Sequence, residues 1–223
     1  MLSDIGAFRA IDKADLLRRI YKGGQEVFDR DLRHLHRQNL VRIVGPKGSV
    51  TKYIALTKPA QQVAEKYLRT NERQQIYAGA VKTRELKHDA TLYRLYEKVA
   101  GEMEDRGQRP IRVVLDYELK RHINKALAKI KELSRQQREQ RIREIAQEHN
   151  LKVVNGKIPL PDLRIEYEHP DGERDLCDLE YVTEHYRARS LAEKAAAGFT
   201  LYGAGQRGRS PYGPDLVGGL IAL

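Results

Sequence analysis

The chain has 223 residues, and its 41 Lys and Arg against 31 Asp and Glu give a formal net charge of +10. This length suits one or two domains with their own cores, and we expect two. The charge favours a polyanionic partner, although it also fits a membrane surface. A single cysteine excludes an intramolecular disulfide. Because no apolar run is long enough to span a membrane and the N-terminus is unlike a secretion signal, we expect a cytoplasmic protein with no membrane partner.

Two helices are predicted near the N-terminus. The first runs over residues 13–21, where apolar residues share one side, and it ends at a Gly-Gly pair. The second covers residues 30–38, with Asp29 as its predicted N-cap. Its apolar residues Leu32 and Leu35 are expected to face inward, which leaves its basic residues on the outer side.

A hairpin is predicted directly after these helices. Residues 40–44 and 51–56 are rich in strand-forming residues, and the segment between them contains Gly, Pro and Lys. A further helix over residues 59–68 closes this region. Helix, helix and then hairpin is the order of a winged helix, so we expect residues 1–70 to be a winged-helix (helix-turn-helix) DNA-binding domain.

The positive charge is concentrated in this N-terminal region. Residues 1–75 hold 15 Lys or Arg against 8 Asp or Glu. Basic side chains on the second helix suit the major groove, and those on the hairpin suit phosphates. The predicted DNA-binding residues are Arg30, Arg33, His34, Arg37, Lys47 and Lys52. The alternatives are a protein-docking module, or arginines that only solubilise the helix.

The middle of the chain is predicted to be mainly helical. Residues 71–87 are polar and read as a linker with a helical part, and a helix opens at His88. After a short strand over residues 111–115, a helical pattern runs over 116–148, and Ser134 marks a point where it would divide into two helices. Glu118 stands in the first turn of this pattern, where the helix dipole favours a carboxylate in any case.

The strongest local pattern is a hairpin over residues 158–182. Two alternating runs flank an Asp-Gly turn signal, and counting back from it places Asp162 level with Tyr181, within a residue, and so beside Glu180. Asp178 and Glu180 share one face of the second strand because side chains two apart point the same way. The residues expected to face the core are Leu163, Ile165 and Tyr167.

Grouped carboxylates repel one another unless a cation neutralises them. Magnesium prefers such oxygen ligands and can assist phosphodiester cleavage, so this face is a candidate metal site. The alternative is a solvated acidic face in which these carboxylates pair with Arg164, Arg174 and Arg187. Both interpretations stay open on local spacing.

A last helix is expected after the hairpin. Ser190 is its predicted N-cap and Glu193 completes a capping box, which directs Lys194 toward the sheet. Residues 206–223 are expected to be a flexible basic tail.

Taken together, the winged helix, the helix opened by His88, Glu118, Pro161-Asp162, Asp178-Leu-Glu180 and Lys194 followed by Tyr202 resemble the replication-relaxation family of plasmids and mobile elements. Residues 88–205 also resemble the restriction-endonuclease-like, PD-(D/E)xK-type fold, an α+β or α/β domain with a mixed central sheet. The resemblance implies metal ligands at Asp162, Asp178 and Glu180, and catalytic roles for these residues with Glu118 and Lys194. The nuclease pattern has lysine two residues after the acid of the second strand, and the chain departs from it. Glu180 stands at that position if the acid is Asp178, and Val182 stands there if the acid is Glu180.

Two functions are therefore expected from the sequence. The favoured one is a non-enzymatic protein that binds double-stranded DNA in replication, mobilisation or transcriptional control of a plasmid or mobile element, with a degenerate nuclease-like domain. The alternative is a magnesium-dependent endonuclease or nickase targeted by the winged helix. Recognition of duplicated half-sites would favour a homodimer.

Overall fold

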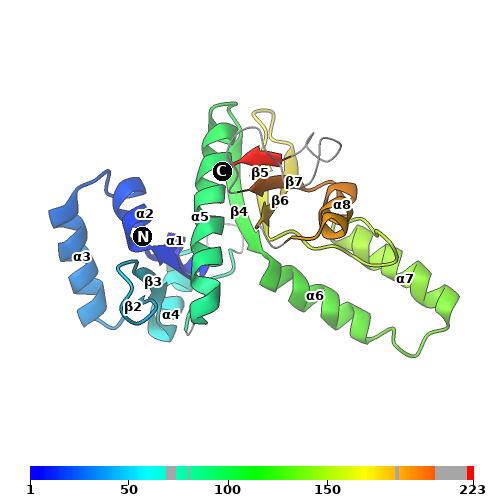
Figure 1. The fold of residues 1–223 in the computed structure, drawn as a ribbon, viewed down its shortest axis with the longest axis horizontal. Coiled ribbons are helices and arrows are strands. Elements are labelled where there is room, and N and C mark those ends of the chain that lie inside the picture. The colour runs from blue at the N-terminus through cyan, green and yellow to red at the C-terminus, as the bar shows by residue number, and fades with distance from the viewer. Residues whose placement is uncertain (69–73, 80, 184–185, 204–219) are drawn as a thin grey trace. The chain divides into compact units, whose positions relative to one another are not determined.

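The computed structural model describes residues 1–68, 74–79, 81–183, 186–203 and 220–223 (Figure 1). This part of the chain is mixed α+β, with eight helices and two sheets, as the coarse fold class predicted. Its contacts divide it into two units. The N-terminal unit holds residues 1–101 with 111–113, and the C-terminal unit holds residues 102–110 with 114–223.

The N-terminal unit places helices around a three-stranded antiparallel sheet of order β1-β3-β2. Its elements are α1 (Leu2–Phe8), β1 (Ile11–Asp12), α2 (Lys13–Arg19), α3 (Gln25–Arg37), β2 (Val41–Val44), β3 (Tyr53–Leu56), α4 (Lys58–Leu68) and α5 (Thr83–Glu104). The predicted helices and hairpin are present. The sequence pattern did not predict α1 and β1, because α1 has seven residues and no capping side chain, and β1 has two residues.

The start of α3 differs from the prediction. Gly24, not Asp29, is the N-cap, and the first helical hydrogen bond runs from Phe28 N–H to the Gly24 carbonyl. Gly23 has a φ of 84°, a left-handed conformation that glycine adopts without strain, and it turns the chain into the helix five residues earlier than predicted. Asp29 therefore lies inside α3, where its side chain accepts hydrogen bonds from Lys13 and Gln25.

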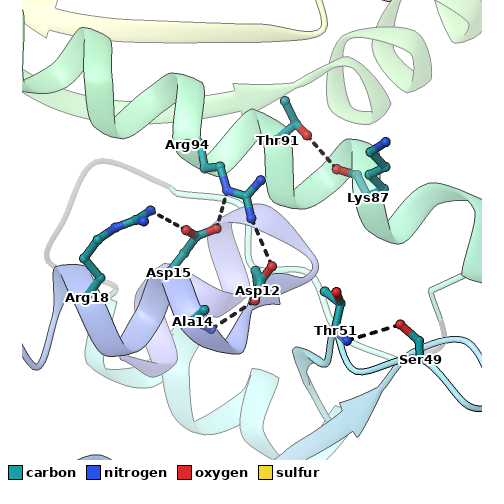
Figure 2. Close-up of polar contacts among 9 residues, drawn as sticks. All are labelled: Asp12, Ala14, Asp15, Arg18, Ser49, Thr51, Lys87, Thr91 and Arg94. Carbon is teal, nitrogen blue, oxygen red and sulfur yellow. Dashed lines mark hydrogen bonds and ion pairs between the residues drawn. The ribbon is translucent and has the colours of Figure 1, made fainter. Parts of the chain in front are cut away.

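Ion pairs connect α5 to the other elements of the N-terminal unit. Figure 2 shows Arg94 reaching from α5 to Asp15 (2.6 Å from Nε) and Asp12 (2.9 Å), while Asp12 also caps α2 by accepting from Ala14 N–H. Arg9 adds contacts to the same helix. The contacts thus group α5 up to residue 101 with the N-terminal unit, whereas the sequence pattern had begun the second domain at residue 88.

The second sheet is five-stranded and mixed, of order β4-β5-β6-β7-β8, and lies in the C-terminal unit except for residues 111–113 of β4. Strands β5 and β6 are antiparallel, and β7 runs parallel to both β6 and β8. The elements that follow α5 are β4 (Arg109–Leu115), α6 (Asp116–Ala128), α7 (Arg135–Glu148), β5 (Leu163–Glu168), β6 (Arg174–Val182), α8 (Ala188–Ala197), β7 (Thr200–Gly203) and β8 (Leu220–Ala222).

The long helical pattern over residues 116–148 is divided into two helices. Ser134 begins α7 with a capping box, in which its hydroxyl accepts from Gln137 N–H and the Gln137 side chain accepts from Ser134 N–H. The sequence left open whether residues 116–148 form one helix or two. The structure has two helices, and Ser134 marks the division between them.

Two predictions near the C-terminus are wrong. Helix α8 begins at Ala188 with Arg187 as its N-cap and no side-chain cap, so Ser190 lies inside the helix and forms no capping box. Residues 220–222 of the predicted flexible tail form β8, because they pair in parallel with β7. Residues 204–219, which hold the rest of that tail, lie outside the described part of the chain.

Three helices cover one face of the second sheet. Apolar residues of α6, α7 and α8, including Ile123, Ile145 and Leu191, pack with Val182 of β6 and Leu201 of β7 in one buried cluster. Since side chains alternate along a strand, the face of β6 that carries Val182 also carries Glu180 and Asp178. The acidic face of the hairpin therefore points toward a helical layer.

Candidate functional site

The β5–β6 hairpin brings Asp162 and Glu180 together. Leu163 pairs with Leu179, which places Asp162 opposite Glu180, one residue from the level expected from the turn. The difference arises because His169 and Glu173 form the last bonded pair, so that the loop has three residues and ends at Gly172 with a φ of 88°. The expected proximity of Asp162 to Glu180 is confirmed.

Reciprocal hydrogen bonds fix these two carboxylates. Asp162 N–H donates to Glu180 Oε2 at 3.1 Å, and Tyr181 N–H donates to Asp162 Oδ2 at 3.0 Å. Each carboxylate thus satisfies a backbone donor on the neighbouring chain segment. The arrangement holds the beginning of β5 in register with the end of β6.

Glu180 is fully buried and is paired with a cation. Its Oε1 lies 2.7 Å from Lys194 Nζ, and it accepts a further hydrogen bond from the Tyr186 hydroxyl. Lys194 also donates to the Leu160 carbonyl at 2.5 Å, so α8 directs this lysine toward the sheet as predicted. Burial, and next the charge of Asp162, raise the pKa of Glu180, whereas Lys194 and Tyr186 act in the opposite direction.

Asp178 is engaged separately, by Arg164. The guanidinium donates to Asp178 Oδ1 at 2.6 Å from Nε and to Oδ2 at 2.8 Å, and it also donates to the His149 and Asn150 carbonyls. Arg164 is 5% exposed, so this pair lies beneath the end of α7. Of the two interpretations of the acidic face, pairing with Arg164 is therefore observed for Asp178, but Glu180 on the same face is buried and Asp178 is half-buried.

Glu118 is buried in the first turn of α6. This turn approaches the start of β5, because Asp116 N–H donates to the Asp162 carbonyl at 3.2 Å. Among the described residues, no three or more His, Cys, Asp or Glu side chains are grouped so as to hold a metal ion. In the arrangement observed, Lys194 is paired with Glu180 and Arg164 with Asp178.

The predicted DNA-binding residues are all exposed to solvent, on α3 and on the β2–β3 connection of the N-terminal unit. Helix α3 buries Phe28 and Leu32 and half-buries Leu35, which follows the predicted inward face. The residues that it and the β2–β3 connection leave exposed are Arg30, Arg33, His34, Arg37, Lys47 and Lys52. Arg30 pairs with Asp31, whereas Arg33, Arg37 and Lys47 form no ion pair with any residue that the structure describes.

A hollow of about 320 Å³ lies beside this helix. Its walls are formed by residues of α3, by the first residue of α2 and by one residue of β2, namely Asp29, Leu32, Arg33, His36, Arg37, Lys13 and Ile43. Of these seven residues, the sequence analysis predicted only Arg33 and Arg37 as binding residues. The helical spacing of residues 29, 33 and 37, and of 32 and 36, is the signal that could have placed the α3 residues on one wall.

Two further observations concern Cys177 and the helices. Burial raises the pKa of the Cys177 thiol to about 11, which suits a packing role better than a reactive one. No helix in the described ranges combines the length and the apolar character that a membrane crossing requires.

Comparisons of the chain with models of protein families, with curated proteins and with solved structures found no match.

Proposed function

We propose that the protein binds double-stranded DNA through α3 and the β2–β3 hairpin. The observation that carries this proposal is the exposed cationic face of α3, where Arg33 and Arg37 form no ion pair with a described residue, together with an exposed lysine, Lys47, in the β2–β3 connection. Cations of this kind release counterions from DNA phosphates on binding. A helix of this width also fits the major groove.

The order of elements supports a winged-helix interpretation. Two helices, α2 and α3, precede a hairpin whose strands form a small antiparallel sheet with β1. In such an arrangement the second helix enters the major groove and the hairpin meets the backbone. On this interpretation the protein acts in replication, mobilisation or transcriptional control of a plasmid or mobile element, and a homodimer would present two α3 helices to paired half-sites.

Charge reversal on α3 tests the proposal. The double substitution Arg33→Glu with Arg37→Glu should lower duplex affinity by roughly tenfold or more at moderate salt, because two phosphate-facing cations become anions. The dependence of affinity on salt should also become shallower, by about 0.9 in log–log slope for each lost contact. Fluorescence anisotropy with a labelled duplex over a salt series measures both quantities.

The control is Arg135→Glu with Arg138→Glu on α7, which makes the same change of net charge at exposed positions of the C-terminal unit. It should leave affinity nearly unchanged. Equal losses in the two variants would mean that total charge, and not the face of α3, governs binding.

A second candidate function is metal-dependent cleavage of DNA. It is favoured by the meeting of Asp162, Glu180 and Lys194, three of the residues that the nuclease-like pattern marks as catalytic. Two features weigh against it: Val182 stands where the pattern has lysine and packs in the apolar cluster, and Arg164 holds Asp178. We therefore favour a nuclease-like scaffold that no longer cleaves.

Nicking of supercoiled plasmid distinguishes the two functions. We expect no nicking above background with magnesium or manganese, because the carboxylates are neutralised by protein cations. If nicking occurs, Asp162→Ala should abolish it, whereas Asp175→Ala, an exposed acid of the same hairpin, should not. Nicking that survives Asp162→Ala would come from a contaminant or from another site.

A further inference from the structure

The hollow beside α3 combines cations with an apolar surface. Arg33 and Arg37 lie one helical turn apart on the same side of α3, and Leu32 and Ile43 form its apolar part. Ile43 is 45% exposed, although it is a large β-branched residue at the centre of a strand. An exposed apolar side chain beside two unpaired cations suits a ligand with one apolar face and one anionic group.

The charges within the hollow are not equivalent. Lys13 lies 3.1 Å from Asp29, and Gln25 donates to the other oxygen of that carboxylate at 2.6 Å. Lys13 and Asp29 thus largely cancel each other. Arg33 also interacts electrostatically with Asp29, but neither Arg33 nor Arg37 forms an ion pair with a described residue, so an anionic group is directed toward these two arginines.

We propose that this hollow receives one sugar–phosphate unit of the DNA backbone, with the phosphate at Arg33 and Arg37 and the deoxyribose against Ile43 and Leu32. This proposal rests on the proposed binding of duplex DNA. It adds which part of the duplex α3 and β2 contact together, namely the sugar–phosphate backbone. The volume of about 320 Å³ is near the lower limit of small-ligand sites, which suits a group of this size. The contact fixes the position of α3 on the duplex without reading its sequence.

The substitution Ile43→Glu tests this contact. It replaces the apolar wall by an anion next to the phosphate position, and duplex affinity should fall roughly tenfold. The matched control is Val27→Glu, which makes the same change on α3 at a residue that is 46% exposed and outside the hollow. It should leave affinity within about twofold of the native protein.

A second variant separates loss of contact from loss of folding. Ile43→Lys disturbs the same position but adds a cation, so duplex affinity should be retained or increased. Equal losses for Ile43→Glu and Val27→Glu, or a loss for Ile43→Lys similar to that for Ile43→Glu, would overturn the proposal. If the native protein binds no duplex DNA, the proposed function itself is wrong, and the native protein alone shows this without any of the variants.

The same chemistry is present in a free nucleotide. Titration of the native protein with deoxythymidine monophosphate, followed by NMR, should give only weak binding, since the hollow takes its ligand as part of a duplex held by other contacts. Saturable binding of the mononucleotide tighter than binding of the duplex would show a site for a free nucleotide, and would overturn the assignment to the DNA backbone.

Discussion

Replacing Arg164 by Met should lower the free energy of unfolding by about 4 kcal/mol. The guanidinium is 5% exposed and makes two hydrogen bonds with the Asp178 carboxylate and two with the carbonyls that follow α7. Methionine fills much of the volume but leaves a nearly buried carboxylate without its cation, and removal of one partner of a buried pair is strongly destabilising. Urea denaturation followed by circular dichroism measures the loss.

Arg174→Met is the matched control for this prediction. Arg174 lies on the same hairpin, is 59% exposed and approaches Glu168 at 3.8 Å, so its removal should cost less than about 1 kcal/mol. Addition of Asp178→Asn to Arg164→Met should restore part of the stability, because the uncompensated charge is then removed. A loss from Arg164→Met no larger than that from Arg174→Met would mean that the buried ion pair contributes little.

This prediction also bears on how the acidic hairpin should be interpreted. Carboxylates at Asp178 and Glu180 satisfy the sequence pattern of a metal site and equally satisfy a pair of internal salt bridges. The metal site and the pair of salt bridges differ only in the cations that lie beside the carboxylates. In the salt bridges these cations are Arg164 and Lys194, which belong to the chain itself. Pairing with cations of the chain itself offsets part of the cost of burying these carboxylates.

The sequence predicted those elements of the fold that depend on residues close together in the chain. Alternation and the Asp-Gly turn signal placed β5 opposite β6 to within one residue, and Ser134 marked the division of α6 from α7. Errors occurred where several local signals compete. Asp29 and Ser190 are good N-cap residues by type, but Gly24 and Arg187 cap those helices, because the preceding chain enters the helix five residues before Asp29 and three residues before Ser190.

Other features depend on contacts that no local pattern carries. The burial of Glu180 follows from the packing of α6, α7 and α8 over β6, and the chain segments involved are up to tens of residues apart. Arg94 joins α5 to Asp12 and Asp15 across about eighty positions of sequence. The hollow near Ile43 likewise needs α2, α3 and β2 to be placed in space before its lining residues can be recognised together.

Replacing Lys194 by Met should lower stability by roughly 3 kcal/mol near pH 8, and by less near pH 5. Glu180 is fully buried, and its pKa is already raised above the ordinary value of 4.5 by burial and by Asp162, while Lys194 and the Tyr186 hydroxyl oppose this rise. A raised pKa means that the folded protein favours the protonated acid. The contribution of Glu180 to stability is therefore fully present below about pH 4.5 and is lost as the pH rises through the folded pKa.

Without Lys194, the pKa of Glu180 should rise further, so that this loss extends to higher pH. Native protein and variant should then have similar stability in acid and diverge as the pH rises, in urea denaturation repeated between pH 5 and 8. Addition of Glu180→Gln should remove most of the pH dependence, and Lys125→Met, at an exposed position of α6, should show none. A constant difference between Lys194→Met and native protein across this range would indicate that Lys194 stabilises the fold through packing and its bond to the Leu160 carbonyl, and not through the charge of Glu180.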